Sequence, residues 1–156
     1  MFKPSLYMHK AVALAIVTAM LCACSGPIGP VAGGKLEGAS TPWPTDWAFT
    51  DEHENVLLET NPFDPYSVTM WGISLDQDFF IAASDPKARW ATHIAQDSRI
   101  VLSVAGQLYS GRADLVVDAT TLKRIGARYG TKYGLDEEQT QQFAADGGLI
   151  YRLTSR

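Results

Sequence analysis

Residues 65–90 read PYSVTMWGISLDQDFFIAASDPKARW, and this stretch decides the fold class. Side chains alternate at period two in residues 66–71 and again in 79–83, which predicts two β-strands. Residues 76–78 are turn formers, and we expect them to join these two strands as a short hairpin. Ser84-Asp85-Pro86 then offers a capping side chain and a proline at the first helical position, which predicts a helix to about residue 96.

The same alternation continues on both sides of this stretch. We expect a strand at residues 56–60 and a second hairpin formed by 99–105 and 109–117. Helices are expected at 119–129 and 136–145, with a closing strand at 148–153. Long hairpins decorated by helices indicate a mainly β fold, a small antiparallel barrel with peripheral helices.

Length and charge narrow the class of protein. The chain has 156 residues, which favours one domain. Its 13 Lys and Arg against 17 Asp and Glu give a formal net charge of −4. Nucleic-acid affinity comes mostly from basic groups that neutralise phosphates. The acidic balance therefore argues against a general nucleic-acid binder.

Residues 1–23 have the pattern of a bacterial signal segment. A basic leader with Lys3 and Lys10 precedes an apolar run at 11–21, which is too short to span a bilayer. The run closes on Leu21-Cys22-Ala23-Cys24, which resembles the lipobox of bacterial lipoproteins and nominates Cys24 as the lipidated first residue of the processed chain. The alternative is an ordinary secretory signal with two incidental cysteines.

Processing at this point would leave 133 residues with 11 basic and 17 acidic groups, a net charge of −6. The only remaining cysteine would carry lipid, so a disulfide, a cysteine metal site and thiol catalysis are all excluded. Residues 24–44 are rich in Gly, Pro, Ala, Ser and Thr, which predicts a flexible tether. Trp43 and Trp47 are expected to clamp the start of the 45–156 domain.

Several short segments occur in an order that a known family shares. They are residues 65–72, 79–84, 87–90, 97–102, 109–113 and 117–118. Their succession resembles the split-barrel flavoproteins of the pyridoxamine-5'-phosphate-oxidase-like superfamily, including their deazaflavin-dependent relatives. The resemblance covers residues 57–133. It implies an antiparallel split β-barrel, a homodimer, and a cofactor, FMN or a deazaflavin coenzyme, whose ring lies at the subunit interface.

The resemblance also implies which residues hold that cofactor. Its phosphate would be bound by Ser84, Lys87 and Arg89, and its ring would contact Thr69 and Trp71. A helix N-terminus independently favours an anion, because its first N–H groups lack partners and carry partial positive charge. Lysine and arginine add charge-assisted hydrogen bonds.

Other interpretations of these residues stay open. Asp85 could cap the helix itself, which would leave Lys87 and Arg89 merely solvated, and its carboxylate would compete with a phosphate. Trp71 could be an ordinary core aromatic. Either face of the strand that carries Thr69 and Trp71 could be the face that meets the ring.

Two further groups of polar residues have both a functional and a structural interpretation. Glu52-His53-Glu54 is expected to be a solvated turn rather than a metal site, because adjacent side chains project in different directions. Arg128-Tyr129 and Lys132-Tyr133 could reach a ligand's polar tail or simply suit a helix end.

The sequence therefore predicts a lipid-anchored protein of the bacterial cell envelope, facing the periplasm or the cell surface. Its split barrel is expected to bind FMN or a deazaflavin coenzyme and to transfer hydride to or from a small organic substrate. The alternative is a split barrel without catalytic activity that binds haem, another ligand or a partner protein. Fold alone does not choose between them.

Overall fold

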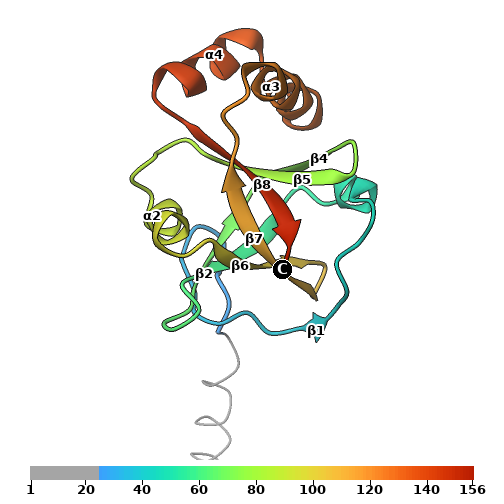
Figure 1. The fold of residues 1–156 in the computed structure, drawn as a ribbon, viewed down its shortest axis with the longest axis vertical. Coiled ribbons are helices and arrows are strands. Elements are labelled where there is room, and N and C mark those ends of the chain that lie inside the picture. Colours follow the sequence, from blue (N-terminus) through green and yellow to red (C-terminus); the bar gives the residue numbers. More distant parts are fainter. Residues whose placement is uncertain (1–24) are drawn as a thin grey trace, which may run out of the picture.

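The computed structural model describes residues 25–156 (Figure 1). The predicted signal segment 1–23 and the predicted lipidation site Cys24 lie outside the described residues. Within 25–156, no helix is long and apolar enough to cross a membrane.

The described chain forms one sheet with helices outside it. The sheet has the strand order β3-β2-β6-β7-β8-β5-β4, with β1 pairing alongside β7. The strands are β1 (Ala39–Ser40), β2 (Val56–Thr60), β3 (Tyr66–Met70), β4 (Gly72–Leu75), β5 (Asp78–Ala83), β6 (Arg99–Val104), β7 (Gln107–Leu115) and β8 (Leu149–Ser155). The helices are η1 (Ala48–Glu52), α2 (Arg89–Gln96), α3 (Ala119–Tyr133) and α4 (Glu137–Ala145).

The sheet must curl into a barrel because of one short connection. Strands β3 and β4 stand at opposite ends of the strand order, yet Trp71 alone joins them. A single residue reaches only a few ångströms, so the two edges have to approach each other. The antiparallel split barrel with peripheral helices is thus confirmed.

One hairpin differs from the prediction. We expected 66–71 as one strand joined directly to 79–83, but β4 lies between them and forms the hairpin with β5. The new strand begins at Gly72, and its lack of a side chain lets the Phe79 ring pack against the backbone there. A Cβ at Gly72 would lie 2.4 Å from the Phe79 ring.

Two apolar clusters lie on the two faces of β5. Phe79 and Ile81 face the barrel interior, where they pack with Trp47, Leu58 and Leu102. Phe80 and Ala82 face outward, and Phe80 packs with Ile73, Ile150, and Ile125 and Tyr129 of α3. The alternation read from the sequence at 79–83 therefore describes a strand that is covered on both faces.

Basic side chains of α3 bind the open edge of β4. Lys132 Nζ donates to the carbonyl oxygens of Gly72 (2.8 Å) and Thr50 (3.0 Å), and Arg128 Nε donates to the carbonyl of Ser74 (3.0 Å). Arg128 also pairs with Asp51. An edge strand presents unpaired carbonyls that a folded protein has to cover. Lys132 and Arg128 do so here, which gives them a structural role in place of the ligand contact considered from the sequence.

Replacing Lys132 by methionine is expected to lower the free energy of unfolding by about 1.5–3 kcal/mol, the scale of hydrogen bonds to charged groups. Methionine keeps the aliphatic stem but removes the charged donor, so the Gly72 carbonyl keeps only the Tyr133 hydroxyl and the Thr50 carbonyl keeps only the His53 N–H. Urea denaturation provides the measurement, with Lys123→Met as the control because Lys123 is exposed on the same helix. Equal losses in the two variants would contradict the covering role.

Helix boundaries follow local capping. The helix expected to begin at residue 86 begins instead at Arg89, because the Asp85 carboxylate accepts from the Lys87 N–H (2.8 Å) and forms a turn. Helix α3 runs four residues further than expected and ends at Gly134, whose φ of 70° suits glycine. Helix α4 is preceded by a capping box between Asp136 and Gln139.

The segment before the domain, predicted as a flexible tether, makes defined contacts over residues 25–44. The Leu36 side chain is buried, and its N–H donates to Glu59 Oε2 (2.5 Å). Gly33 exchanges backbone hydrogen bonds with Ser67 of β3. Trp43 packs against Gly111 and, as expected, contacts Trp47, with ring centroids 5.0 Å apart.

Candidate functional site

A cavity of about 350 Å³ lies between the outer face of the barrel and the pair α3–α4. Figure 1 shows these two helices over one end of the sheet, above β5 and β8. The cavity lining is mostly apolar, with a few polar groups, and comes from both layers. It comprises Trp71, Ala82, Ser84, Gly126, Tyr129, Leu135, Gln139, Thr140, Phe143 and Ile150.

Stacked aromatic rings fix one wall of the cavity. Trp71, 42% exposed, stacks on Tyr133 with centroids 4.4 Å apart and planes 9° from parallel. Tyr133 stacks in turn on Tyr129 (5.7 Å). The Tyr133 hydroxyl also lies 2.8–3.0 Å from the Gly72 backbone oxygen and nitrogen, which ties Trp71 and β4 to α3. The indole of Trp71 is thus held in place with part of its surface open.

The cavity walls carry no formal charge. Burial raises the pKa of the Tyr129 phenol, with a smaller contribution from Tyr133, so Tyr129 stays protonated at neutral pH. Its hydroxyl donates to the carbonyl of Phe80 (3.3 Å). The other polar groups on the lining are the hydroxyls of Ser84 and Thr140 and the amide of Gln139. Such a surface suits an uncharged ring with hydrogen-bonding edges.

The chain leaves the cavity rim at Ser84 and reaches α2 through the turn at 84–88. The N-cap residue of α2, Ala88, supplies no side-chain acceptor, and the first helical hydrogen bond is from Thr92 N to Ala88 O. The N–H groups of Arg89, Trp90 and Ala91 therefore have no acceptor among the described residues. The N–H groups without acceptors thus lie about one turn later than the sequence indicated, because the Asp85 carboxylate accepts from the Lys87 N–H and the helix begins only at Arg89.

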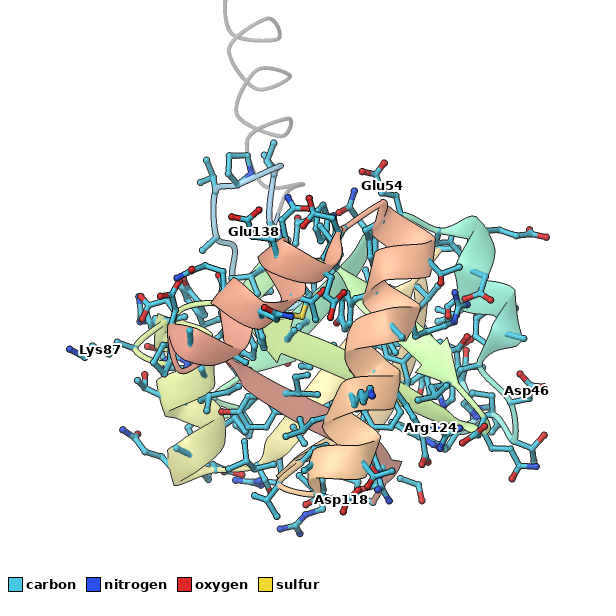
Figure 2. The ribbon with its side chains drawn as sticks, turned by 90° about the horizontal axis from the view of Figure 1, so that it is seen from above. Asp46, Glu54, Lys87, Asp118, Arg124 and Glu138 are labelled. Carbon is cyan, nitrogen blue, oxygen red and sulfur yellow. The ribbon has the colours of Figure 1, made fainter. Side chains whose placement is uncertain are left out.

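The five sequence-predicted cofactor residues are not all together. Trp71 and Ser84 both line the cavity. Lys87 is exposed on the turn, and Figure 2 shows its side chain pointing away from α3 and α4. The Arg89 guanidinium lies 4.5 Å from the Tyr66 ring centroid. Thr69 is half-buried on β3, where it pairs with Leu57, and it is not a lining residue.

The sequence predicted the two helices and a possible ligand contact at Arg128-Tyr129 and Lys132-Tyr133, but not that α3 and α4 together cover a cavity. One signal was present: Gly126 lies inside α3, where glycine is unfavourable. A Cβ at this position would lie 2.7 Å from Thr140 Cγ2, so glycine lets α4 cross close to α3. A helix-interior glycine marks such a crossing.

The remaining titratable candidates from the sequence have partners within the fold. No group of three His, Cys, Asp or Glu residues that could hold a metal occurs within the described range. His93 Nδ1 lies 3.0 Å from Thr60 Oγ1, and its ring packs against Tyr66. Asp97 pairs with Arg99, which holds the pKa of this carboxyl at about 2.

Comparison with known proteins gives matches to solved structures alone. No protein-family model matches the chain, and no curated protein matches it in sequence. The haem storage protein HutZ from Vibrio cholerae matches with a TM-score of 0.57 and 14% identity, over 69% of this chain and 85% of that one. A conserved hypothetical protein from Mycobacterium tuberculosis matches with a TM-score of 0.56 and 19% identity, over 69% and 76%.

A third match is a protein of unknown function from Agrobacterium tumefaciens, with a TM-score of 0.52 and 23% identity. It covers 65% of this chain, which spans about half (48%) of that protein. At these identities the matches show the fold. That fold is an antiparallel split barrel.

Proposed function

We propose that this chain is an envelope-anchored split-barrel protein that binds FMN or a deazaflavin coenzyme and exchanges hydride with a small organic substrate. The observation that carries the proposal is the apolar cavity of about 350 Å³ beside the half-exposed Trp71. The lipid anchor on Cys24, the envelope location and a homodimer are parts of the proposal that rest on the sequence alone.

The cavity fits the ring part of such a cofactor. Ligand sites are concave and mostly apolar, with a few polar groups that set orientation, and they start at about 300 Å³. The Trp71 and Tyr129 side chains offer aromatic surface, and Ser84, Gln139 and Thr140 offer donors and acceptors for the ring edges. The lining has no charged group that an uncharged ring would have to desolvate.

The start of α2 supports the second half of the proposal, the binding of the cofactor's phosphate. The three N–H groups of residues 89–91 have no acceptor among the described residues, and the same segment carries two cations, the exposed Lys87 and Arg89, whose guanidinium packs on the Tyr66 ring. Asp85 opposes this, because its carboxylate lies in the same turn. The net balance of two cations and a helix start against one carboxylate favours binding.

When bound, the ring would accept or donate hydride, and the chain's own residues would supply position and environment. The cavity walls exclude water from the ring. The hydroxyl of Ser84 would orient its polar edge, while the start of α2 would hold the phosphate. Burial raises the pKa of the Tyr129 phenol and keeps it neutral, and its hydrogen bond to the Phe80 carbonyl holds it in the cavity wall.

Haem is less well supported as the ligand. Protein ligands to haem iron are His, Cys, Met or Tyr. The only one of these on the cavity lining is Tyr129, whose hydroxyl already binds the Phe80 carbonyl. A binding module without catalysis remains the alternative, since the cavity lining offers no group suited to acid–base chemistry.

The proposal is tested by titrating the purified full chain with FMN, with riboflavin and with the deazaflavin coenzyme. Visible absorbance and flavin fluorescence report binding. A ring that lies beside Trp71 should also quench the fluorescence of this tryptophan. We expect dissociation constants in the micromolar range or below. Absence of saturable binding by both cofactors would remove the oxidoreductase and favour the binding module.

The phosphate contact gives a prediction of its own. Changing Lys87 and Arg89 together to alanine should weaken FMN binding about 10- to 100-fold, the equivalent of about 1.5–3 kcal/mol for a hydrogen bond to a charged group. Riboflavin has no phosphate, so its affinity should not change. Asp85→Asn should instead tighten FMN, because it removes the competing charge.

Lys123→Ala serves as the control, since it removes a cation from the exposed side of α3. Unfolding is measured alongside, because Arg89 also packs on Tyr66. If FMN and riboflavin lose the same affinity in the double variant, the phosphate is bound elsewhere.

A further inference from the structure

Exposed apolar side chains gather at the end of the barrel where the described chain begins. Ile28 and Val31 are each 66% exposed at the tip of a turn closed by two backbone hydrogen bonds of 3.0 Å between them. Phe63, in the β2–β3 turn, is 87% exposed. The two turns are neighbours, because Gly33 bonds to Ser67 just after the β2–β3 turn.

Cations border the same end. Lys35, Arg99 and Arg156 line a small cleft of about 210 Å³ together with Pro62. The Arg99 guanidinium lies 5.2 Å from the Phe63 ring centroid. The acidic groups here are Asp97, which pairs with Arg99, the buried Glu59, which binds the Leu36 N–H, and the exposed Asp64 and Glu37, the latter in a cleft beside Ile28. Lys35 and Arg156 have no acidic partner among the described residues.

The first described residue, Ser25, lies beside this surface. The carbonyl of Ser25 accepts from Gly34 N (2.6 Å), so residue 25 is held at the base of the exposed turn. The predicted lipidation site is the residue before it. Helices α3 and α4, which cover the cavity, lie at the far end of the molecule (Figure 1).

We propose that Ile28, Val31 and Phe63 enter the headgroup region of the bilayer that holds Cys24. This inference rests on the lipid anchor in the proposed function. Apolar tips beside basic side chains are typical of surfaces that lie in a membrane interface, where the apolar groups leave water and the cations meet lipid phosphates. The barrel would then stand upright, and its cavity would face away from the membrane.

The test uses cysteine labelling of the processed full chain. Of the two native cysteines, Cys22 leaves with the signal and Cys24 is blocked by lipid, so an introduced cysteine is the only free thiol. Ile28→Cys and Phe63→Cys, labelled with bimane, are placed in vesicles of phosphatidylethanolamine and phosphatidylglycerol. We expect a blue-shifted emission and quenching by phospholipids that carry a spin label near the headgroup.

Val117→Cys is the matched control, because Val117 is 80% exposed and precedes Asp118, which Figure 2 places away from the chain start. Its label should keep its emission in water and escape quenching. Equal spectra at the three positions would overturn the inference while leaving the anchor intact. A wild-type chain absent from the membrane fraction would instead remove the anchor, and the inference with it.

Discussion

Replacing Trp47 by alanine is expected to lower the free energy of unfolding by about 3–5 kcal/mol, the range for large aromatic residues in a core. Trp47 is fully buried. Its ring centroid lies 5.0–5.2 Å from those of Trp43, Phe79 and Tyr109. The cavity left by alanine would remove these contacts together. Denaturation in urea, followed by circular dichroism, gives the measurement.

Trp71→Ala is the matched control. This tryptophan is 42% exposed and stacks on one ring, Tyr133, so its loss should cost about 1 kcal/mol. The two variants distinguish a tryptophan that packs in the barrel core from one that lines the cavity. Trp71→Ala should weaken ligand binding far more than it lowers the free energy of unfolding. Similar stability losses in both would contradict the assignment of Trp47 to the core.

A third variant isolates the indole nitrogen. Trp47 Nε1 is buried without a hydrogen-bond partner among the described residues. Phenylalanine keeps an aromatic ring but removes this unpaired donor, whose burial costs free energy. Trp47→Phe should therefore lose much less stability than Trp47→Ala.

The barrel could be predicted because its strands obey a simple period. In β5, Phe79 and Ile81 alternate with Phe80 and Ala82, and the alternation survives although both faces are covered. The break between β3 and β4 could not be predicted in the same way. It depends on the contact between Gly72 and the Phe79 ring, which are seven residues apart in the chain and meet only after the hairpin forms.

Composition also gave an incomplete account of residues 25–44. Glycine favours flexibility in an isolated chain, but it also lets two backbones approach closely. A Cβ at Gly38 would lie 2.3 Å from the Gly106 carbonyl oxygen. This glycine is therefore needed where β1 runs alongside β7, a role that depends on residues nearly seventy positions away and that composition does not reveal.

The candidate site, too, could be predicted from the sequence only in part. The sequence singled out Trp71 and Ser84, which line the cavity, because they lie in the segments that carry the family resemblance. The covering helices could not, because their contribution to the cavity arises from the crossing of α3 and α4 at Gly126. The start of α2 also differs from the prediction, because the Asp85 carboxylate accepts from the Lys87 N–H in a turn and the helix begins only at Arg89.

Filling the cavity is expected to weaken the binding of both flavins. Ala82 lies on the outer face of β5 and lines the cavity floor opposite α3 and α4. A phenyl ring at this position would project into the space of about 350 Å³ that the ring of the ligand requires. Ala82→Phe should weaken FMN and riboflavin equally, by at least about 10-fold, which corresponds to about 1.4 kcal/mol.

The free energy of unfolding distinguishes a blocked cavity from a destabilised fold. An apolar ring placed in an existing cavity gains contacts, so the free energy of unfolding should stay within about 1 kcal/mol of wild type or rise. Ala95→Phe, on the exposed side of α2, adds the same side chain outside the cavity and should leave binding unchanged. The pattern differs from that of the Lys87 and Arg89 variant, which affects FMN and spares riboflavin. If Ala82→Phe binds both flavins as tightly as wild type, the ring lies elsewhere, and the cavity must be assigned to another ligand.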